Sequence, residues 1–317
     1  MFFTHQRLNV KHATKKIHFR VALLRFFACQ GLQKTNKRFK SKQQFYLLPE
    51  PDFIHWLNGV TDGDGSFSFS VNKKKNSIWN CTFKIAQSTY NLRLLYYIKK
   101  NLGYGSINTK SGKNMAEFRI RDRKTLLNLV VPLFTQYPLY STKQFYFSRW
   151  VKALHILENT KYISSEKNAL LTLLKNESPP NTYISPPWEK SFPSNEWIYG
   201  FIEAEGSFFI VNKDKNIPRM VHSFGITQKL DKIILDFLQK KFHISSKVLH
   251  TKRNIYKLET TNSRSIVKIQ KFFYNKLKGI KSLEYKIWAR SLHYKQNNEK
   301  LLIIQNQLQK LRNKLKK

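Results

Sequence analysis

The chain has 317 residues, and its 41% hydrophobic content is enough for a packed core, which argues against global disorder. Its 57 Lys and Arg residues outnumber 19 Asp and Glu residues, and this net charge of +38 points to a polyanionic partner such as nucleic acid. Two cysteines cannot form a disulfide framework or a zinc site by themselves, and the longest apolar run is too short to span a membrane.

The N-terminal segment, residues 1–50, contains many Lys and Arg residues, and its first acidic residue is Glu50. Organelle targeting segments are typically basic and poor in acids. A basic arm along DNA, or a remnant of a host reading frame, would have a similar composition. The sequence therefore leaves three interpretations of residues 1–50 open: a targeting segment, a DNA arm or a host-frame remnant.

A twelve-residue pattern occurs twice. Residues 56–67 read WLNGVTDGDGSF, and residues 197–208 read WIYGFIEAEGSF. Downstream, FKIAQ at 83–87 matches FGITQ at 224–228 at the same spacing. Such agreement in one register predicts an internal duplication.

Each copy predicts the same series of elements. The repeated motif is helical in pattern, and the alternating residues after it indicate a strand. Further helices are expected at Asn91–Leu102 and Asp231–Phe242, and further strands at Glu117–Arg121 and Tyr256–Thr260. With a closing helix pair, the expected order per copy is α-β-β-α-β-β-α-α, an α+β fold with antiparallel sheets.

These elements predict two domains and a linker. The first domain is expected at residues 51–175 and the second, with a basic C-terminal tail, at 196–317. Residues 176–195 contain half of the 10 prolines in the chain, and Pro-rich spacers are semi-rigid. We therefore interpret residues 176–195 as the linker.

The motif helices carry small residues four positions apart, which allow two helices to approach closely. These residues are Gly59, Gly63, Gly200 and Ala204. If the helices pack side by side, Asp64 and Glu205 come together at their ends. Neighbouring carboxylates repel unless cations neutralise them, and Mg²⁺ binds through one or two carboxylates and substrate phosphates. The sequence therefore predicts a divalent-metal site at Asp64 and Glu205.

The two motifs, LNGVTDGDG at 57–65 and IYGFIEAEG at 198–206, resemble those of the single-chain, two-motif LAGLIDADG homing endonucleases. The resemblance covers roughly residues 53–295. It implies a pseudo-twofold αββαββα core, with the motif helices at the domain interface and the sheets forming a DNA-binding saddle. It also implies metal-dependent cleavage of both strands of a long asymmetric DNA site, promoting intron homing.

The resemblance implies roles for individual residues. The last acid of each motif would hold metal, the later Gln would support the water network, and a late Lys would stabilise the phosphoanion. The acids before them, Asp62 and Glu203, would be structural or helix-capping. The predicted catalytic residues are Asp64, Glu205, Gln87, Gln228, Lys143 and Lys281.

The first strand of each copy is expected to read DNA. In the first copy, serines alternate with apolar residues, giving one polar face that could meet the major groove. In the second copy, Phe209 and Val211 replace two polar positions, so either the register slips by one or this half reads DNA by shape. Lysines at the hairpin tips would contact phosphates. The predicted DNA-binding residues are Ser66, Ser68, Ser70, Asn72, Lys74, Thr82, Lys84, Ser207, Lys213 and Lys215.

Two functions are consistent with these sequence features. The first is the homing endonuclease, favoured because both motif acids are present. The alternative is an intron-encoded RNA maturase that assists splicing of its own intron, with or without nuclease activity, and intron RNA is then a further partner. The unequal halves favour a monomer, and the composition and intron association favour a mitochondrion, with a plastid as second choice.

Overall fold

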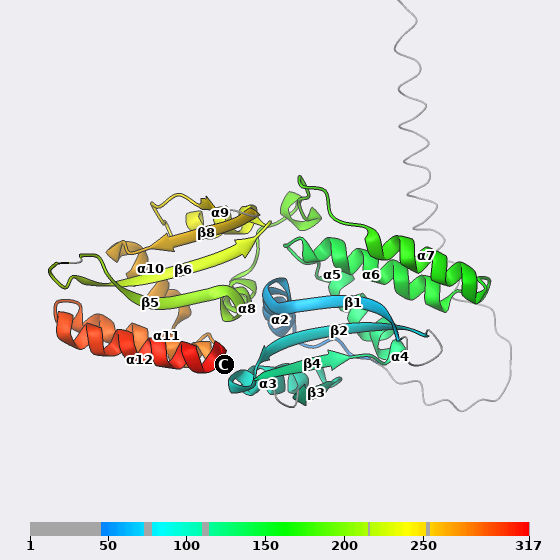
Figure 1. Cartoon of the computed structure of the whole chain (residues 1–317), viewed down its shortest axis with the longest axis horizontal. Helices are drawn as coiled ribbons and strands as arrows, with labels where there is room; N and C mark the ends of the chain where they lie inside the picture. The colour runs from blue at the N-terminus through cyan, green and yellow to red at the C-terminus, as the bar shows by residue number, and fades with distance from the viewer. Residues whose placement is uncertain (1–45, 73–77, 110–113, 215, 252–253, 317) are drawn as a thin grey trace, which may run out of the picture. The chain divides into compact units, whose positions relative to one another are not determined.

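Two four-stranded antiparallel sheets, one from each sequence copy, form the framework of the protein (Figure 1). The computed structural model describes residues 46–72, 78–109, 114–214, 216–251 and 254–316. The predictions for residues 1–45, Lys74 and Lys215, and for the side chain of Asn72, lie outside the described residues.

The first half, residues 46–176, begins with the motif helix and ends with a helical hairpin. Its elements are α2 (Pro51–Asp64), β1 (Gly65–Asn72), β2 (Ile78–Ser88), η1 (Thr89–Asn91), α3 (Leu92–Leu102), β3 (Ser106–Thr109), β4 (Met115–Ile120), α4 (Arg123–Thr125), η2 (Leu126–Val130), α5 (Val131–Gln136), α6 (Lys143–Glu158) and α7 (Ser164–Asn176).

The second half, residues 195–316, repeats this order after a connection that contains η3 (Pro186–Glu189). Its elements are α8 (Asn195–Glu205), β5 (Gly206–Asn212), β6 (Met220–Lys229), α9 (Lys232–Lys241), β7 (Leu249–Thr251), β8 (Ile255–Thr260), α10 (Ser263–Phe273), α11 (Lys281–Ser291), η5 (Leu292–Tyr294) and α12 (Asn298–Lys316). The predicted α+β class and the order of elements in each copy are confirmed.

The two sheets have equivalent strand orders, β1-β2-β4-β3 and β5-β6-β8-β7. Gly65 pairs with Ile85 in the first sheet, and Gly206 pairs with Ile226 in the second. The pairing registers of the two halves therefore correspond, and of the two explanations for Phe209 and Val211 the register slip is wrong. The face of the second sheet that carries Phe209 and Val211 is less polar than the corresponding face of the first sheet.

One face of each sheet is buried against helices, because apolar residues alternate along β1 and β5. Phe67 and Phe69 are buried in the first half, and Phe208 and Ile210 in the second. Phe67 stacks on Phe83 with ring centroids 5.2 Å apart. Each such fully buried side chain contributes about 1.5–3 kcal/mol to folding, so the alternation fixes which face of each sheet stays open.

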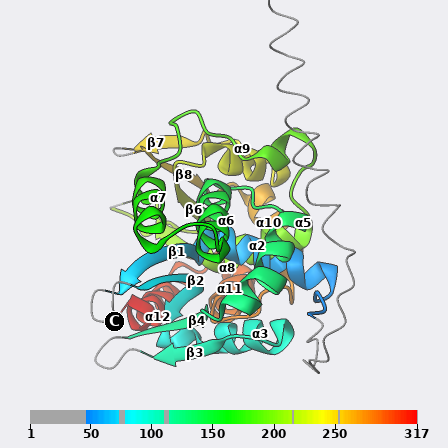
Figure 2. The ribbon, with the colours of Figure 1, turned by 90° about the vertical axis from the view of Figure 1, so that its right-hand side faces the viewer.

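Helices α2 and α8 pack directly against each other between the two sheets (Figure 1; Figure 2). A Cβ atom on Gly59 would lie 2.7 Å from Phe201 N, and one on Gly200 would lie 2.9 Å from Val60 N. Both distances are below any ordinary contact. The predicted close approach of the motif helices is confirmed, and only glycine allows it.

The basic C-terminal tail forms α12, which covers the free edge of β5. Gln305 Nε2 donates to Ile210 O at 2.8 Å, and Arg312 Nη2 donates to Phe208 O at 2.5 Å. These bonds occupy carbonyls that an open edge would offer to another chain. No helix in the described part of the chain combines the length and apolar character that crossing a membrane requires.

Candidate active site

Asp64 and Glu205 are the last residues of α2 and α8, so the helix crossing brings them together. A Cβ on Gly63 would lie 3.3 Å from Glu205 Cγ, which shows how closely the two helix ends approach. Burial and the neighbouring charge of Asp64 raise the pKa of Glu205 to about 7. Burial also raises the pKa of Asp64, against the influence of Lys143 and Gln87.

This donor set fits a hard divalent cation. The two carboxylates are partly buried and repel each other, and the backbone carbonyls of Gly63 and Gly206 belong to neighbouring residues. Oxygen donors of this kind suit Mg²⁺, which completes its shell with water and substrate phosphate. A bound cation would offset the repulsion that raises the pKa of Glu205.

Lys143 and Lys281 begin equivalent helices, α6 and α11, and both reach the motif ends. The ammonium of Lys143 donates to Gly63 O, and Lys281 Nζ donates to Gly206 O at 2.6 Å. Burial lowers the pKa of Lys143, although the charge of Asp64 opposes this shift. The structure therefore brings both predicted lysines to the predicted acids.

The preceding acids, Asp62 and Glu203, hold the turns that lead into these lysines. Asp62 accepts the backbone N–H of Ser141 at 2.9 Å, and Glu203 accepts that of Gly279 at 2.8 Å. Asp62 also accepts Trp197 Nε1 from the second half at 2.7 Å. Their hydrogen bonds are structural and their carboxylates point at the turns.

The two glutamines are placed differently. Gln87 Nε2 donates to Asp64 Oδ2, next to the predicted metal position. Gln228 Nε2 instead faces Asp231 Oδ2 at 3.5 Å, and within the described residues it makes no hydrogen bond to Glu205. The structure brings together one predicted Gln–acid pair out of two.

A sequence model described as "LAGLIDADG endonuclease" matches residues 57–154 and 198–292, which include both motifs and both lysines. The chain belongs to this LAGLIDADG family. It is 39% identical over 271 residues to "Probable intron-encoded endonuclease Cox1-I1b" of Schizosaccharomyces pombe, covering 83% of this chain and 70% of that protein. It is 30% identical to "Uncharacterized mitochondrial protein RF1" of Saccharomyces cerevisiae, covering 62% of this chain and 39% of that one.

Solved structures of LAGLIDADG proteins have the same fold. The LAGLIDADG meganuclease I-CpaMI bound to uncleaved DNA is 25% identical, with a TM-score of 0.66, covering 80% of this chain and 98% of that one. I-SmaMI, bound to uncleaved DNA in the presence of calcium ions, is 22% identical with a TM-score of 0.68, covering 83% of this chain and 99% of that one.

The predicted DNA-reading residues of this LAGLIDADG chain differ in their exposure. Ser66, Ser68 and Ser70 lie on the open face of β1, where Ser66 pairs with Lys84. Lys84 Nζ forms an ion pair with Glu117 at 3.3 Å.

The other predicted DNA-binding residues differ in how much of each side chain is exposed. Thr82 is only 8% exposed, so its side chain offers little surface to a partner. Ser207 is partly buried on the open face of β5, and Lys213 is exposed beyond that strand. Phe209 and Val211 lie on the same open face as Ser207, although both side chains are apolar.

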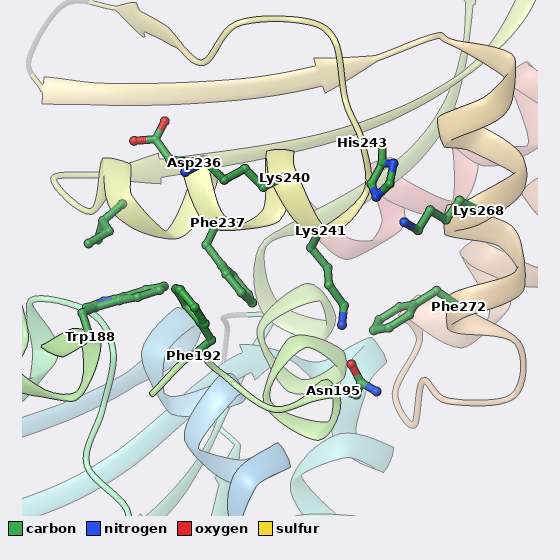
Figure 3. Close-up of a pocket in the computed structure, with 11 residues that line it drawn as sticks. Trp188, Phe192, Asn195, Asp236, Phe237, Lys240, Lys241, His243, Lys268 and Phe272 are labelled. Carbon is green, nitrogen blue, oxygen red and sulfur yellow. The ribbon is translucent and has the colours of Figure 1, made fainter. Parts of the chain in front are cut away.

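Two pockets among the described residues are lined by side chains that could bind nucleic acid or metal. One, of about 470 Å³, is lined at the acids by Glu205 and Lys143 and farther out by Gln228 and Asp231. The other, of about 830 Å³, lies along α9 and is lined by aromatic and basic side chains (Figure 3).

Sequence reasoning missed two residues at the site, Asn91 and Asp231. Each follows the Gln of its own half by three or four positions and contacts the turn before the lysine of the other half. The recurrence of a polar residue just after each Gln was the available signal.

Proposed function

We propose that this protein is a site-specific, double-strand DNA endonuclease that promotes intron homing. It hydrolyses one phosphodiester bond in each strand of a long, asymmetric site, with Mg²⁺ as the divalent metal. The observation that supports this most is the pairing of Asp64 and Glu205 at the crossing of α2 and α8, between the two sheets.

The acids and lysines divide the chemical work. Asp64 and Glu205 would hold the metal, which supplies charge at the phosphate and activates water. Lys143 and Lys281 place a positive charge beside the acids, where negative charge grows on the phosphate oxygens in the transition state. Gln87 fixes the orientation of the Asp64 carboxylate through its amide N–H.

DNA would lie across the open faces of the two sheets. Serines on β1 offer hydrogen bonds to base edges, and apolar residues on β5 suit contact with thymine methyl groups and readout of shape. Because one chain supplies both motif acids, a monomer suffices, with domains at 51–175 and 196–317 joined by the linker at 176–195.

We place the protein in the mitochondrion. Two relatives support this: one is called a probable intron-encoded endonuclease, Cox1-I1b, and the other a mitochondrial protein, RF1. For residues 1–50, a targeting segment, a DNA arm and a host-frame remnant remain the alternatives.

The decisive experiment is cleavage of a plasmid that carries the intron-less junction of the host gene. We expect linear product with Mg²⁺ and no product with EDTA or when the intron interrupts the junction. Intact plasmid at saturating protein and Mg²⁺, on DNA that the protein binds, would refute the nuclease proposal.

A second candidate, binding of intron RNA as a maturase, is supported by the hollow along α9. Phe192 is 75% exposed there, and Lys241 and Lys268 line the same hollow (Figure 3). Aromatic rings next to lysines suit unpaired bases and their phosphates.

This candidate is tested by binding of the intron transcript to the variants Phe192→Ala and Lys241→Glu. We expect weaker RNA binding with unchanged affinity for the DNA site. Equal loss for both nucleic acids, or no loss, would assign no RNA role to this hollow.

A further inference from the structure

In each half, one polar side chain reaches into the other half. There it accepts a hydrogen bond from the turn that precedes the proposed catalytic lysine of that other half. Asn91 Oδ1 accepts the backbone N–H of Ile280 at 2.8 Å, immediately before Lys281. Asp231 Oδ1 accepts the backbone N–H of Thr142 at 2.7 Å, immediately before Lys143, and also Thr142 Oγ1 at 2.6 Å. Each lysine is thus held in place by both halves.

The sequence around Asn91 is adapted to this contact. Asn91 is 3% exposed, and a Cβ on Gly279 would lie 2.5 Å from Asn91 Oδ1. Glycine at 279 leaves room for the crossing side chain, and Glu203 accepts the N–H of the same glycine at 2.8 Å. The turn is therefore held by a side chain from each half.

The two crossing residues differ in chemistry. An Asn side chain can donate and accept, whereas an ionised Asp can only accept. Asn91 Nδ2 donates to Gln87 Oε1 at 2.9 Å, which leaves the Gln87 N–H groups free to donate to Asp64. Asp231 can donate nothing to Gln228, so Gln228 turns its Nε2 towards Asp231 at 3.5 Å.

We propose that Asn91 and Asp231 are positioning residues that make the two half-sites unequal. Asn91 holds Gln87 on Asp64, whereas Asp231 draws Gln228 away from Glu205, and both anchor the lysine turn opposite. The half-site containing Asp64 and Gln87 therefore cuts its strand faster than the half-site containing Glu205. The inference rests on the proposed nuclease function.

The test is a set of three variants in single-turnover cleavage of the DNA site, with each strand labelled separately. In the unsubstituted protein, the strand rates should differ by about 10–100-fold, the worth of one hydrogen bond to a charged group. Asp231→Asn keeps the anchor and allows Gln228 to turn to Glu205, so it should accelerate the slower strand and bring the ratio towards one. Asn91→Asp should slow the faster strand.

Asp231→Ala removes the anchor itself. We expect it to slow cleavage about 10–100-fold, as misplacement of a catalytic group does, with the Kd for the DNA site unchanged. Rescue by Asp231→Asn, together with the unchanged Kd, would distinguish a positioning role from general loss of structure. Equal strand rates in the unsubstituted protein, or a strand ratio that Asp231→Asn leaves unchanged, would overturn the inference.

A measurement on metal-free protein separates this inference from the proposed function. Hydrogen exchange of the peptide around Thr142 should accelerate in Asp231→Ala and remain slow in Asp231→Asn. If exchange follows this pattern while no variant cuts DNA, the nuclease proposal fails and the anchor stands. If Asp231→Ala leaves exchange at Thr142 unchanged, the anchor is refuted.

Discussion

The acids of the two motifs differ in their hydrogen-bond partners. Asp62 receives N–H groups from Tyr140, Ser141 and Trp197, and these donors oppose the rise in its pKa that burial causes. Glu205 instead faces Asp64, and its pKa rises to about 7. Donors from the protein therefore surround Asp62, whereas a bound cation would offset the repulsion between Glu205 and Asp64.

This contrast predicts opposite effects for two similar substitutions. Asp64→Asn should abolish double-strand cleavage and leave the Kd for DNA within about twofold, because it removes a proposed metal ligand while the strands proposed to contact DNA stay intact. Asp62→Asn should cost about 1–3 kcal/mol of stability, because an amide cannot accept all of the same donors. Cleavage assays and urea unfolding measure the two effects. Normal cleavage by Asp64→Asn would show that the metal assignment is wrong.

The sequence could predict that Asp64 and Glu205 end two neighbouring helices, because this placement depends on local spacing within one repeated motif. The positions of the Asn91 and Asp231 side chains could not be predicted, because each contacts a turn of the other half that lies far away in the chain. The orientation of Gln228 could not be predicted either, since it depends on the charge of its neighbour Asp231.

Among the elements, the α2–α8 pair depends most on single residues. Ala is a better helix former than Gly by about 1 kcal/mol, so Gly59→Ala would stabilise an isolated helix. In the protein, the added methyl group would collide with the backbone of α8, and we expect a net loss of about 1–3 kcal/mol. Gly200→Ala should behave alike in urea unfolding. Higher stability for either variant would contradict the close contact.

Strand β6 contains a second testable group, His222, which lies under α11. Its Nε2 is 2.7 Å from Ser291 Oγ, and burial lowers the pKa of His222 to about 4 from an ordinary 6.5. The folded state therefore disfavours protonation, and this contribution to stability is present above about pH 6.5 and is lost as the pH falls towards 4. The slope is at most about 1.4 kcal/mol per pH unit.

The contribution of His222 can be isolated by comparison with His222→Gln. The raised pKa values of Glu205 and Asp231 act in the opposite direction, because the folded state then holds protons more tightly than the unfolded state. Only the difference between the two proteins reports His222. The difference in Tm should change between pH 7 and pH 4, and a constant difference would refute the assignment.

The order of helices and strands could be predicted because apolar periodicity records burial along each element. The covering of the β5 edge by α12 could not, since it depends on long side chains such as Arg312 reaching backbone carbonyls. Arg312 also forms an ion pair with Glu284 at 2.7 Å, and Glu284 lies 3.3 Å from Lys281 Nζ. The tail therefore contributes to the surroundings of Lys281, one of the two lysines proposed to be catalytic, and composition alone did not indicate this.

At the scale of the whole molecule, the net charge of +38 favours binding to DNA phosphates, and the affinity of such binding depends on salt concentration. Each phosphate that the protein neutralises should lower the logarithm of affinity by about 0.9 per logarithm of salt concentration. We expect the affinity for any DNA to decrease steeply as the salt concentration rises. The ratio between the affinities for the target site and for other DNA should decrease less. Fluorescence anisotropy across a salt series measures both, and a flat series would contradict phosphate-dominated binding.

The glycine contact between α2 and α8 has a consequence for the length of DNA that the protein can measure. Because the helix backbones touch, the sheet faces proposed to read DNA should stay at a fixed separation, and the distance between the two DNA half-sites should be fixed in turn. One base pair inserted between the half-sites adds about 3.4 Å and rotates one half-site by about a tenth of a turn relative to the other. Such an insertion should abolish cleavage even when every contacted base is retained.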